Sequence, residues 1–238
     1  MFQKVIFCLL FLFIPLNRAA VNTVANSPFT SSEPVSELAA GELLFEEMEL
    51  GGTVNFIAFR QAVAGYNRIK EKSKPILTLI DFSKPSTEKR FFVFDMEKKK
   101  LLYSSVVAHG RNSGENYATS FSNQYGSYKS SLGFYLTENT YQGGNGYSLI
   151  LNGLEKGIND KAKARSIVVH GAPYANPSVA ASGRLGRSLG CPALPTKLAR
   201  PIINTIKDGS VMFIYANNSS YLAQSDILKN VSAPMPAL

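Results

Sequence analysis

The sequence predicts a mainly β fold with short helical insertions and an N-terminal helical pair. Short runs of β-branched and aromatic residues recur between residues 75 and 216, separated by glycine, proline and polar residues. Two stretches with apolar residues at helical spacing precede them. Hydrophobic residues make up 45% of the 238 residues and charged residues 18%, a composition typical of a globular protein with a real core.

The first 20 residues have the features of an export signal. Lys4 is followed by an apolar run from Val5 to Leu16, and the small residues Ala19 and Ala20 come after it. The run is shorter than the ~20 residues that span a bilayer, so we expect a cleaved signal peptide, with a retained N-terminal anchor as the alternative. The sequence therefore predicts an exported protein of the periplasm or cell envelope.

Cleavage of this segment changes the charge and the cysteine content. The net charge is +8 for the whole chain and about +6 without Lys4 and Arg18. Cys8 leaves with the signal, so Cys191 becomes the single cysteine and has no partner for an internal disulfide. A lone cysteine is a buried small residue, an intermolecular bridge or a reactive thiol. Its place between Gly190 and Pro192, in a loop-like stretch, favours the reactive thiol.

Residues 34–72 are expected to form an N-terminal helical layer, which follows a small, polar linker at residues 21–33. The first helix is predicted from Pro34 to Leu50 and is ended by two glycines, after which Thr53 is placed to cap a second helix. The apolar residues at helical spacing are Leu38, Phe45 and Met48 in the first helix, and Phe56, Phe59, Val63 and Tyr66 in the second.

Residues 75–216 are expected to form the main, β-rich domain. The predicted strands are 76–82, 90–96, 101–109, 133–138, 148–154, 165–170 and 211–215. Residues 97–100 are predicted as a charged hairpin turn, and the glycine-rich residues 142–147 as a mobile flap or a plain loop. A short helix is expected between 195 and 209, broken at Pro201. Residues 217–238 lack periodicity and are predicted to be a peripheral tail.

The basic charge narrows the range of partners. A basic exported protein is suited to acidic polymers of the cell wall or to an anionic membrane surface. Nucleic acid is not expected, because no binding motif is recognisable and the signal directs export. With two histidines and no cluster of metal ligands, neither a metal nor a cofactor is expected. The oligomeric state is left open.

A histidine and a cysteine carry the chemistry. The β-branched run from Ser166 to Val169 ends at His170 and Gly171, and 21 positions after the histidine a glycine-rich turn delivers Cys191. The thiolate is the reactive form of cysteine, and a nearby imidazole commonly generates it at neutral pH. The pair therefore favours nucleophilic acyl transfer. His109 also precedes a glycine at the end of a predicted strand, where it would line the cleft or pack as a strand-end residue.

These residues resemble a known family, the murein L,D-transpeptidase catalytic domain (YkuD-like). The family has a histidine followed by a small residue and then a Ser/Thr-x-Gly-Cys element, which correspond here to His170-Gly171 and to Ser188 through Cys191. The segment GRLGRSLGCPALP is similar to the branch that has this form in place of the commoner SHGC element. The resemblance extends to the blocks VAHGRNSG, FSNQYGSYKSSLGFYLT and GLEKGIND, and it implies a sandwich-like or barrel-like β domain over residues 75–216.

The resemblance implies roles for the site residues. The Cys191 thiolate would attack a peptidoglycan tetrapeptide stem, release D-alanine and form a thioester that a neighbouring stem's amine converts to a 3–3 cross-link. His170 would move the proton, the Gly171 carbonyl would fix its tautomer, and backbone N–H groups at Gly190 and Cys191 would stabilise the oxyanion.

Two positions depart from the commoner motif, Leu189 in place of histidine and Ala193 in place of arginine or asparagine. Arg184 and Arg187 are candidates to bind the carboxylates of the stem, or they face solvent. Ser188 is a candidate for hydrogen bonds within the loop or to substrate, and His109 for the cleft.

Three alternatives stay open. An L,D-carboxypeptidase would transfer the same thioester to water. A sortase-like transpeptidase also uses cysteine, histidine and arginine, but the blocks around His170 and Cys191 argue against it. A non-catalytic wall-binding protein would retain substrate with an unreactive thiol.

Overall fold

The computed structural model describes residues 37–229, and its core is one eight-stranded sheet. The predicted signal at 1–20 and linker at 21–33 lie outside the described residues. The strands follow the order β3-β2-β1-β8-β4-β5-β6-β7 across the sheet. Their bounds are Ile76–Asp81 (β1), Phe91–Asp95 (β2), Lys100–Ser105 (β3), Gly133–Gly143 (β4), Gly146–Gly153 (β5), Val168–Gly171 (β6), Ala193–Leu194 (β7) and Val211–Tyr215 (β8).

The central strands form because their side chains are apolar on both faces. Every residue of β1, β2 and β8 is buried, as expected for runs that carry aromatic and β-branched residues without alternation. β1 pairs antiparallel with β2 and parallel with β8. The phenyl rings of Phe134 on β4 and Phe213 on β8 stack with centroids 4.2 Å apart, which ties the two halves of the sheet together.

The sheet curls until its two edges nearly meet. Beyond β3, Ala108 forms a two-bond bridge with Ala193 of β7: Ala108 N donates to Ala193 O at 2.8 Å and Ala193 N donates to Ala108 O at 3.2 Å. Closing a sheet in this way removes open edges. The fold is therefore mainly β and barrel-like, as the sequence predicted, and the near-closure places the segment after β3 beside the strand that follows Cys191.

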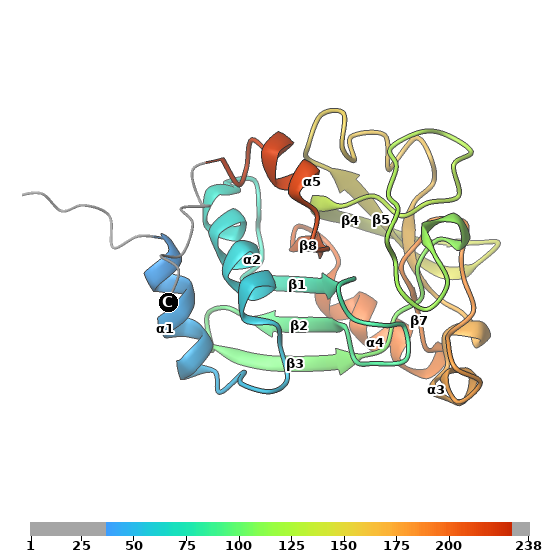
Figure 1. The fold of residues 1–238 in the computed structure, drawn as a ribbon, viewed down its shortest axis with the longest axis horizontal. Coiled ribbons are helices and arrows are strands. Elements are labelled where there is room, and N and C mark those ends of the chain that lie inside the picture. The colour runs from blue at the N-terminus through green and yellow to red at the C-terminus, as the bar shows by residue number, and fades with distance from the viewer. Residues whose placement is uncertain (1–36, 230–238) are drawn as a thin grey trace, which may run out of the picture. The chain divides into compact units, whose positions relative to one another are not determined.

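The helical pair packs on one side of the sheet (Figure 1). α1 spans Glu37–Glu47 and α2 spans Phe56–Arg68. The centroid of the Phe59 ring on α2 lies 5.7 Å from that of Phe45 on α1 and 5.1 Å from that of Phe94 on β2. Both ring pairs pack edge-to-face, and they hold α2 against α1 and the sheet. The prediction of Thr53 as the cap of α2 is wrong. Asn55 caps it, because its side-chain oxygen accepts from Ile57 N at 3.0 Å and Ala58 N at 3.3 Å.

The remaining helices are α3 (Pro177–Ala180), α4 (Thr196–Ile206) and α5 (Ser219–Gln224). The predicted break of α4 at Pro201 is wrong, because the helix continues through the proline. Pro201 removes one backbone hydrogen bond from the helix, and the burial of Ile202, Ile203 and Ile206 stabilises the helix by more than this loss. Among residues 37–229, no helix is long and apolar enough to cross a membrane.

The prediction of a peripheral tail beyond residue 216 is wrong as far as residue 229. Tyr221 and Leu228 are buried, and the Tyr221 hydroxyl donates to the Glu155 carboxylate at 3.1 Å. The glycine-rich residues 142–147 also differ from a loop. They form the tip of the β4–β5 hairpin, where Gly143 pairs with Gly146. The predicted strand 101–109 ends earlier, at Ser105, because the chain turns there toward β7.

Candidate active site

His170 lies on β6, a short strand that forms because Val168 and Val169 are buried beside it. Its Nδ1 lies 3.0 Å from the carbonyl oxygen of Gly171. A carbonyl can only accept, so Nδ1 carries the proton and Nε2 of the neutral ring is left with a lone pair. Burial lowers the pKa of His170, and the bond to Gly171 partly offsets this effect. The imidazole is thus neutral and has one basic nitrogen, which is what a general base requires.

Gly171 is glycine because helix α4 packs closely on β6. A Cβ at this position would lie 2.9 Å from the Cβ of Ala199 on α4. This close packing fixes the backbone of Gly171, so that its carbonyl oxygen stays within hydrogen-bond distance of His170 Nδ1. The pairing of this carbonyl with the ring is the geometry that the family resemblance implied.

Cys191 lies just before β7, which pairs parallel with β6 so that His170 is opposite Ala193. The residue is 7% exposed, and its thiol lies 3.6 Å from the carbonyl oxygen of Ser166, to which it donates. Burial raises the pKa of the thiol, and the Val168 N–H and the Arg165 guanidinium oppose that rise. The structure therefore places Cys191 in the turn before β7 and His170 on the neighbouring strand β6. In the part of the chain described, the thiol is bonded to Ser166 and not to the imidazole.

The turn that carries Cys191 is held by two serines. Ser188 Oγ donates to the Cys191 carbonyl at 2.6 Å and accepts from Gly190 N at 3.0 Å. Ser130 Oγ donates to the Gly190 carbonyl at 3.0 Å. Gly190 has a φ of +128°, and a Cβ there would lie 2.9 Å from both the Lys129 carbonyl oxygen and Ile167 Cδ1. Only glycine fits this turn.

The role of Ser188 follows from those bonds. It is 4% exposed and its hydroxyl both donates and accepts within the loop, so the prediction of substrate contact is wrong and the within-loop alternative is right. The Gly190 N–H is occupied by Ser188 Oγ. Within residues 37–229, the N–H groups of Leu189 and Cys191 donate to no backbone carbonyl and to no side chain of another residue, so these two are available to an oxyanion.

Arg184 and Arg187 converge on one carboxylate, that of Glu115. Arg187 Nη1 lies 2.7 Å from Glu115 Oε1, and Arg184 Nε lies 3.1 Å from Oε2. Arg187 Nη1 also donates to the carbonyls of Arg111 at 3.0 Å and Gly114 at 3.1 Å, so it anchors this loop. Because the Glu115 side chain is 70% exposed, the pair is a carboxylate-binding arrangement that is open to solvent on one side.

His109 does not line the cleft. It is fully buried, and its Nδ1 lies 2.7 Å from Nη2 of Arg90, which is also fully buried. Because a guanidinium only donates, Nδ1 accepts and Nε2 carries the proton toward the Gly114 carbonyl at 3.3 Å. Burial and the Arg90 charge lower the pKa of His109 to about 4. The prediction of a substrate-binding His109 is wrong, and its alternative of a packed residue is right.

Sequence reasoning missed the importance of Arg165, which was taken only as the start of a strand. Its Nη1 donates to the Ser122 carbonyl at 2.8 Å and to Ser131 Oγ at 2.6 Å, and its Nη2 donates to the Lys129 carbonyl at 2.8 Å and to Ser127 Oγ at 3.2 Å. No carboxylate of the described residues pairs with this guanidinium. An arginine three residues before the strand that bears His170 was the available signal.

A cavity of about 230 Å³ borders the thiol's hydrogen-bond partner. It is lined by Ser166, Ile167 and Val168 on one side and by Tyr141 of the β4–β5 hairpin on another. Lys163, which also lines it, forms a salt bridge with Glu138 at 2.7 Å. The cavity offers a substrate room next to the Cys191 turn. Among residues 37–229, no three His, Cys, Asp or Glu side chains are placed to hold a metal.

His170 on β6 and Cys191 in the turn that leads into the neighbouring parallel strand β7 give this nearly closed sheet the imidazole and the thiol of a thiol acyltransferase site. The family model of the L,D-transpeptidase catalytic domain matches residues 51–215, most of the chain. The chain therefore belongs to the L,D-transpeptidase catalytic domain family.

Solved structures with a similar chain are distant. The L,D-transpeptidase LdtMt1 in complex with imipenem is 15% identical, with a TM-score of 0.36 over 59% of each chain. The L,D-transpeptidase from Stackebrandtia nassauensis is 13% identical, with a TM-score of 0.36 over 77% of this chain and 79% of the other. The helical cell shape determining protein Pgp2 from Campylobacter jejuni is 14% identical, with a TM-score of 0.42 over 67% and 55%.

The chain spans about 59% of the length of LdtMt1. No curated protein matches it. The family assignment is carried by the family model alone.

Proposed function

We propose that this chain is a cysteine-dependent peptidoglycan L,D-transpeptidase that acts outside the cytoplasm. The observation that supports this proposal most directly is the assembly of a neutral, tautomer-fixed His170 beside a cysteine whose turn presents free backbone N–H groups. The family's catalytic-domain match and the predicted export signal at 1–20 are consistent with it.

The reaction begins with a rotation of the thiol. Cys191 Sγ leaves the Ser166 carbonyl and gives its proton to Nε2 of His170, so that a thiolate and an imidazolium form together. The thiolate attacks the carbonyl carbon of the stem's third residue. The N–H groups of Cys191 and Leu189 stabilise the tetrahedral oxyanion, a contribution whose loss typically costs about a hundredfold or more in rate.

The intermediate collapses to a thioester. The C–N bond to the terminal D-alanine breaks, and the imidazolium of His170 protonates the leaving amine. His170 is then neutral again and takes a proton from the amine of a neighbouring stem as this amine attacks the thioester. The C–S bond breaks, and the imidazolium gives this proton to the departing thiolate of Cys191. The products are a 3–3 cross-link and the free thiol. Arg184 and Arg187, which hold Glu115 in this structure, would exchange it for a stem carboxylate.

The test is intact-mass spectrometry of the protein with a purified tetrapeptide stem. The wild type is expected to gain the mass of the stem minus D-alanine, and Cys191→Ala is expected to gain nothing. His170→Gln keeps a similar volume and should reduce the rate of adduct formation by about a hundredfold or more. A cross-linked dimer as product supports the transpeptidase, and a tripeptide supports the L,D-carboxypeptidase. Folded protein with a free thiol that forms no adduct would overturn the proposal.

A further inference from the structure

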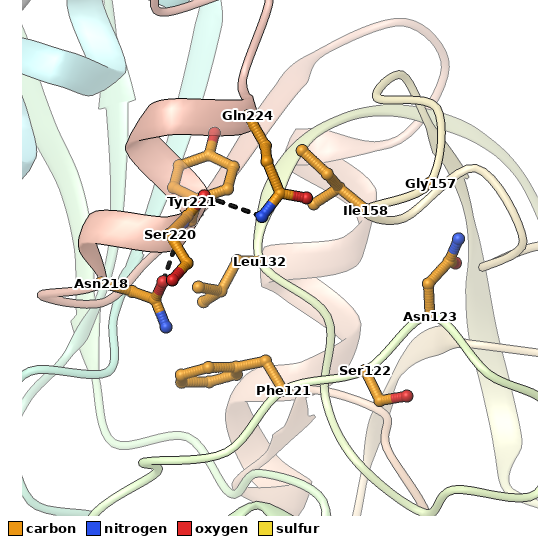
Figure 2. Close-up of a pocket in the computed structure, with 10 residues that line it drawn as sticks. All are labelled: Phe121, Ser122, Asn123, Leu132, Gly157, Ile158, Asn218, Ser220, Tyr221 and Gln224. Atoms are coloured by element: carbon orange, nitrogen blue, oxygen red, sulfur yellow. Dashed lines mark hydrogen bonds between the residues drawn. The ribbon is translucent and has the colours of Figure 1, made fainter.

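A groove beside the loop at 117–123 takes part in none of the reaction steps proposed for Cys191 and His170. It consists of two adjoining cavities of about 210 Å³ and about 330 Å³, which share Phe121 and Asn218. Figure 2 shows the first cavity, between α5 and the segments around Phe121 and Ile158. The second continues past Asn217 to Tyr117. No charged side chain of residues 37–229 lines either cavity, although the whole chain has a net charge of +8.

The groove presents polar groups that make no hydrogen bond within residues 37–229. Asn218 accepts from Tyr221 N at 2.8 Å through Oδ1, which leaves its amide nitrogen free. Gln224 donates to the Ser220 carbonyl at 3.0 Å through Nε2, which leaves its Oε1 free, and Figure 2 shows this oxygen directed toward Ile158. The exposed side chains of Asn217 and Tyr117 make no hydrogen bond within the described residues.

Aromatic and apolar surface lies among these amides. Phe121 is half-buried and stacks on Phe82 with centroids 6.2 Å apart, so it forms a fixed wall shared by both cavities. Tyr117 is 51% exposed at one end and Leu132 is buried at the other. A ligand that fills the groove must therefore be neutral, rich in hydrogen-bonding groups and apolar on one face.

These requirements describe a saccharide. A charged peptide would lose hydration here without a countercharge, and a purely apolar ligand would leave the amides unpaired. Hydroxyl and acetamido groups match the free amides, while the C–H face of a sugar ring packs on an aromatic side chain.

The groove is also coupled to the catalytic turn. Ser122, which lines the first cavity, accepts from Arg165 Nη1 through its carbonyl at 2.8 Å, and Arg165 directly precedes the Ser166 carbonyl that holds the thiol.

We propose that this groove binds the neutral, N-acetylated glycan strand to which the stem peptides are attached. The choice of this glycan rests on the proposed function, whereas the neutral, sugar-binding character rests on the lining alone. A glycan held in the groove would leave its stem free to reach Cys191 by way of the loop that Arg165 anchors.

The experiment measures binding of a neutral N-acetylglucosamine tetrasaccharide, without stem peptides, to the full chain carrying Cys191→Ala. Tyr117→Ala combined with Asn217→Ala is expected to weaken binding by about tenfold or more, because the first substitution removes an aromatic ring and the second removes a side-chain amide. The matched control is Tyr125→Ala combined with Gln124→Ala, which removes the same two types of group from an exposed loop outside both cavities. The control is expected to bind as the parent does.

Three outcomes would overturn the proposal: no binding by the parent protein, equal loss in the control, or no loss in the groove variant. Because the probe carries no stem and the nucleophile is absent, these outcomes are independent of transpeptidase activity. A protein that forms the stem thioester but does not bind the tetrasaccharide refutes the groove proposal and leaves the proposed function standing. A protein that binds the tetrasaccharide but forms no thioester refutes the proposed function and leaves the sugar-binding groove standing.

Discussion

The thiol of Cys191 donates to the carbonyl of Ser166, 3.6 Å away, and Ser166 adopts a left-handed backbone conformation with a φ of +56°. Non-glycine residues rarely adopt this conformation, so surrounding contacts must hold it. A carbonyl can accept only from the protonated thiol, so this bond favours the resting, uncharged form. The guanidinium of Arg165, one residue earlier, favours the thiolate. Burial raises the pKa of the thiol, and the Val168 N–H and the Arg165 guanidinium oppose that rise, so Arg165 is one of the groups that set the reactivity of Cys191.

Replacement of Arg165 should therefore make the thiol less reactive near neutral pH. In Arg165→Met the positive charge is lost, the pKa of Cys191 rises further, and alkylation by iodoacetamide slows several-fold. The measurement is the pH profile of the alkylation rate, which needs no substrate. Arg165→Lys keeps the charge but loses the paired bonds to the loop at 122–131, so its profile should lie closer to that of the wild type. Identical profiles for the methionine and lysine variants would show that Arg165 acts only by holding the loop.

Addition of one methyl group at Gly190 should distort the catalytic turn. In Gly190→Ala the new Cβ meets the Lys129 carbonyl oxygen and Ile167 Cδ1 at 2.9 Å, on a backbone with φ of +128°. We expect a loss of about 1–3 kcal/mol in the free energy of unfolding, measured by urea denaturation, and a lower yield of thioester.

Gly144→Ala is the matched control, because a Cβ there meets nothing within 4 Å. It should change neither quantity. A Gly190→Ala protein as stable and active as this control would contradict the close packing described for the turn.

His109 should make stability depend on pH. Its pKa is lowered to about 4 from 6.5, so the folded protein binds this proton less tightly than the unfolded chain does. The stabilisation is therefore fully present above pH 6.5 and is lost as the pH falls through about 4, a difference of roughly 3 kcal/mol.

Denaturation of His109→Gln, which keeps one donor and one acceptor, should show a smaller loss of stability over this range. An NMR titration checks the same point without a variant, because the chain has only two histidines. The ring resonance of His109 should not titrate near pH 6.5, and a titration there would contradict the buried, neutral assignment.

The fold was predictable where runs of residues are unambiguous. The buried strands β1, β2 and β8 lie close to their predicted bounds, because continuous apolar and aromatic runs leave few other structures open. The pairing of a histidine with a later cysteine was also predictable from the residues, whereas the Gly171 carbonyl as partner of the imidazole came from the family resemblance.

What could not be predicted depends on contacts between residues distant in the sequence. Nothing near His109 indicates that Arg90, 19 residues earlier, buries it and takes its Nδ1. The tail has too few apolar residues for a periodic pattern, and its anchor, Glu155, lies 66 residues before Tyr221. Ser188 could be assigned to the loop only once its bond to the Cys191 carbonyl was visible.

The buried carboxyl of Glu155 should tie the tail more firmly at low pH than at high pH. It accepts from Phe134 N at 2.7 Å and from the Tyr221 hydroxyl at 3.1 Å, and it is also hydrogen-bonded to Ser225. Burial raises the pKa of Glu155 above its usual 4.5 despite these bonds. A raised pKa means that the folded state favours the protonated form, so the stabilisation is present below 4.5 and is lost as the pH rises through the folded value.

Hydrogen exchange of residues 219–228 provides the measurement. After correction for the intrinsic rate, wild-type protection in this segment should decrease as the pH rises above 4.5, whereas Glu155→Gln, which stays neutral, should keep the same protection throughout. Ser225→Ala removes one hydroxyl partner but leaves the carboxyl, so the decrease should persist in that variant. Equal pH dependence in the wild type and in Glu155→Gln would assign the decrease to another group. Because Tyr221 and Gln224 of this segment line the groove at α5, a loosened tail should also weaken saccharide binding at high pH.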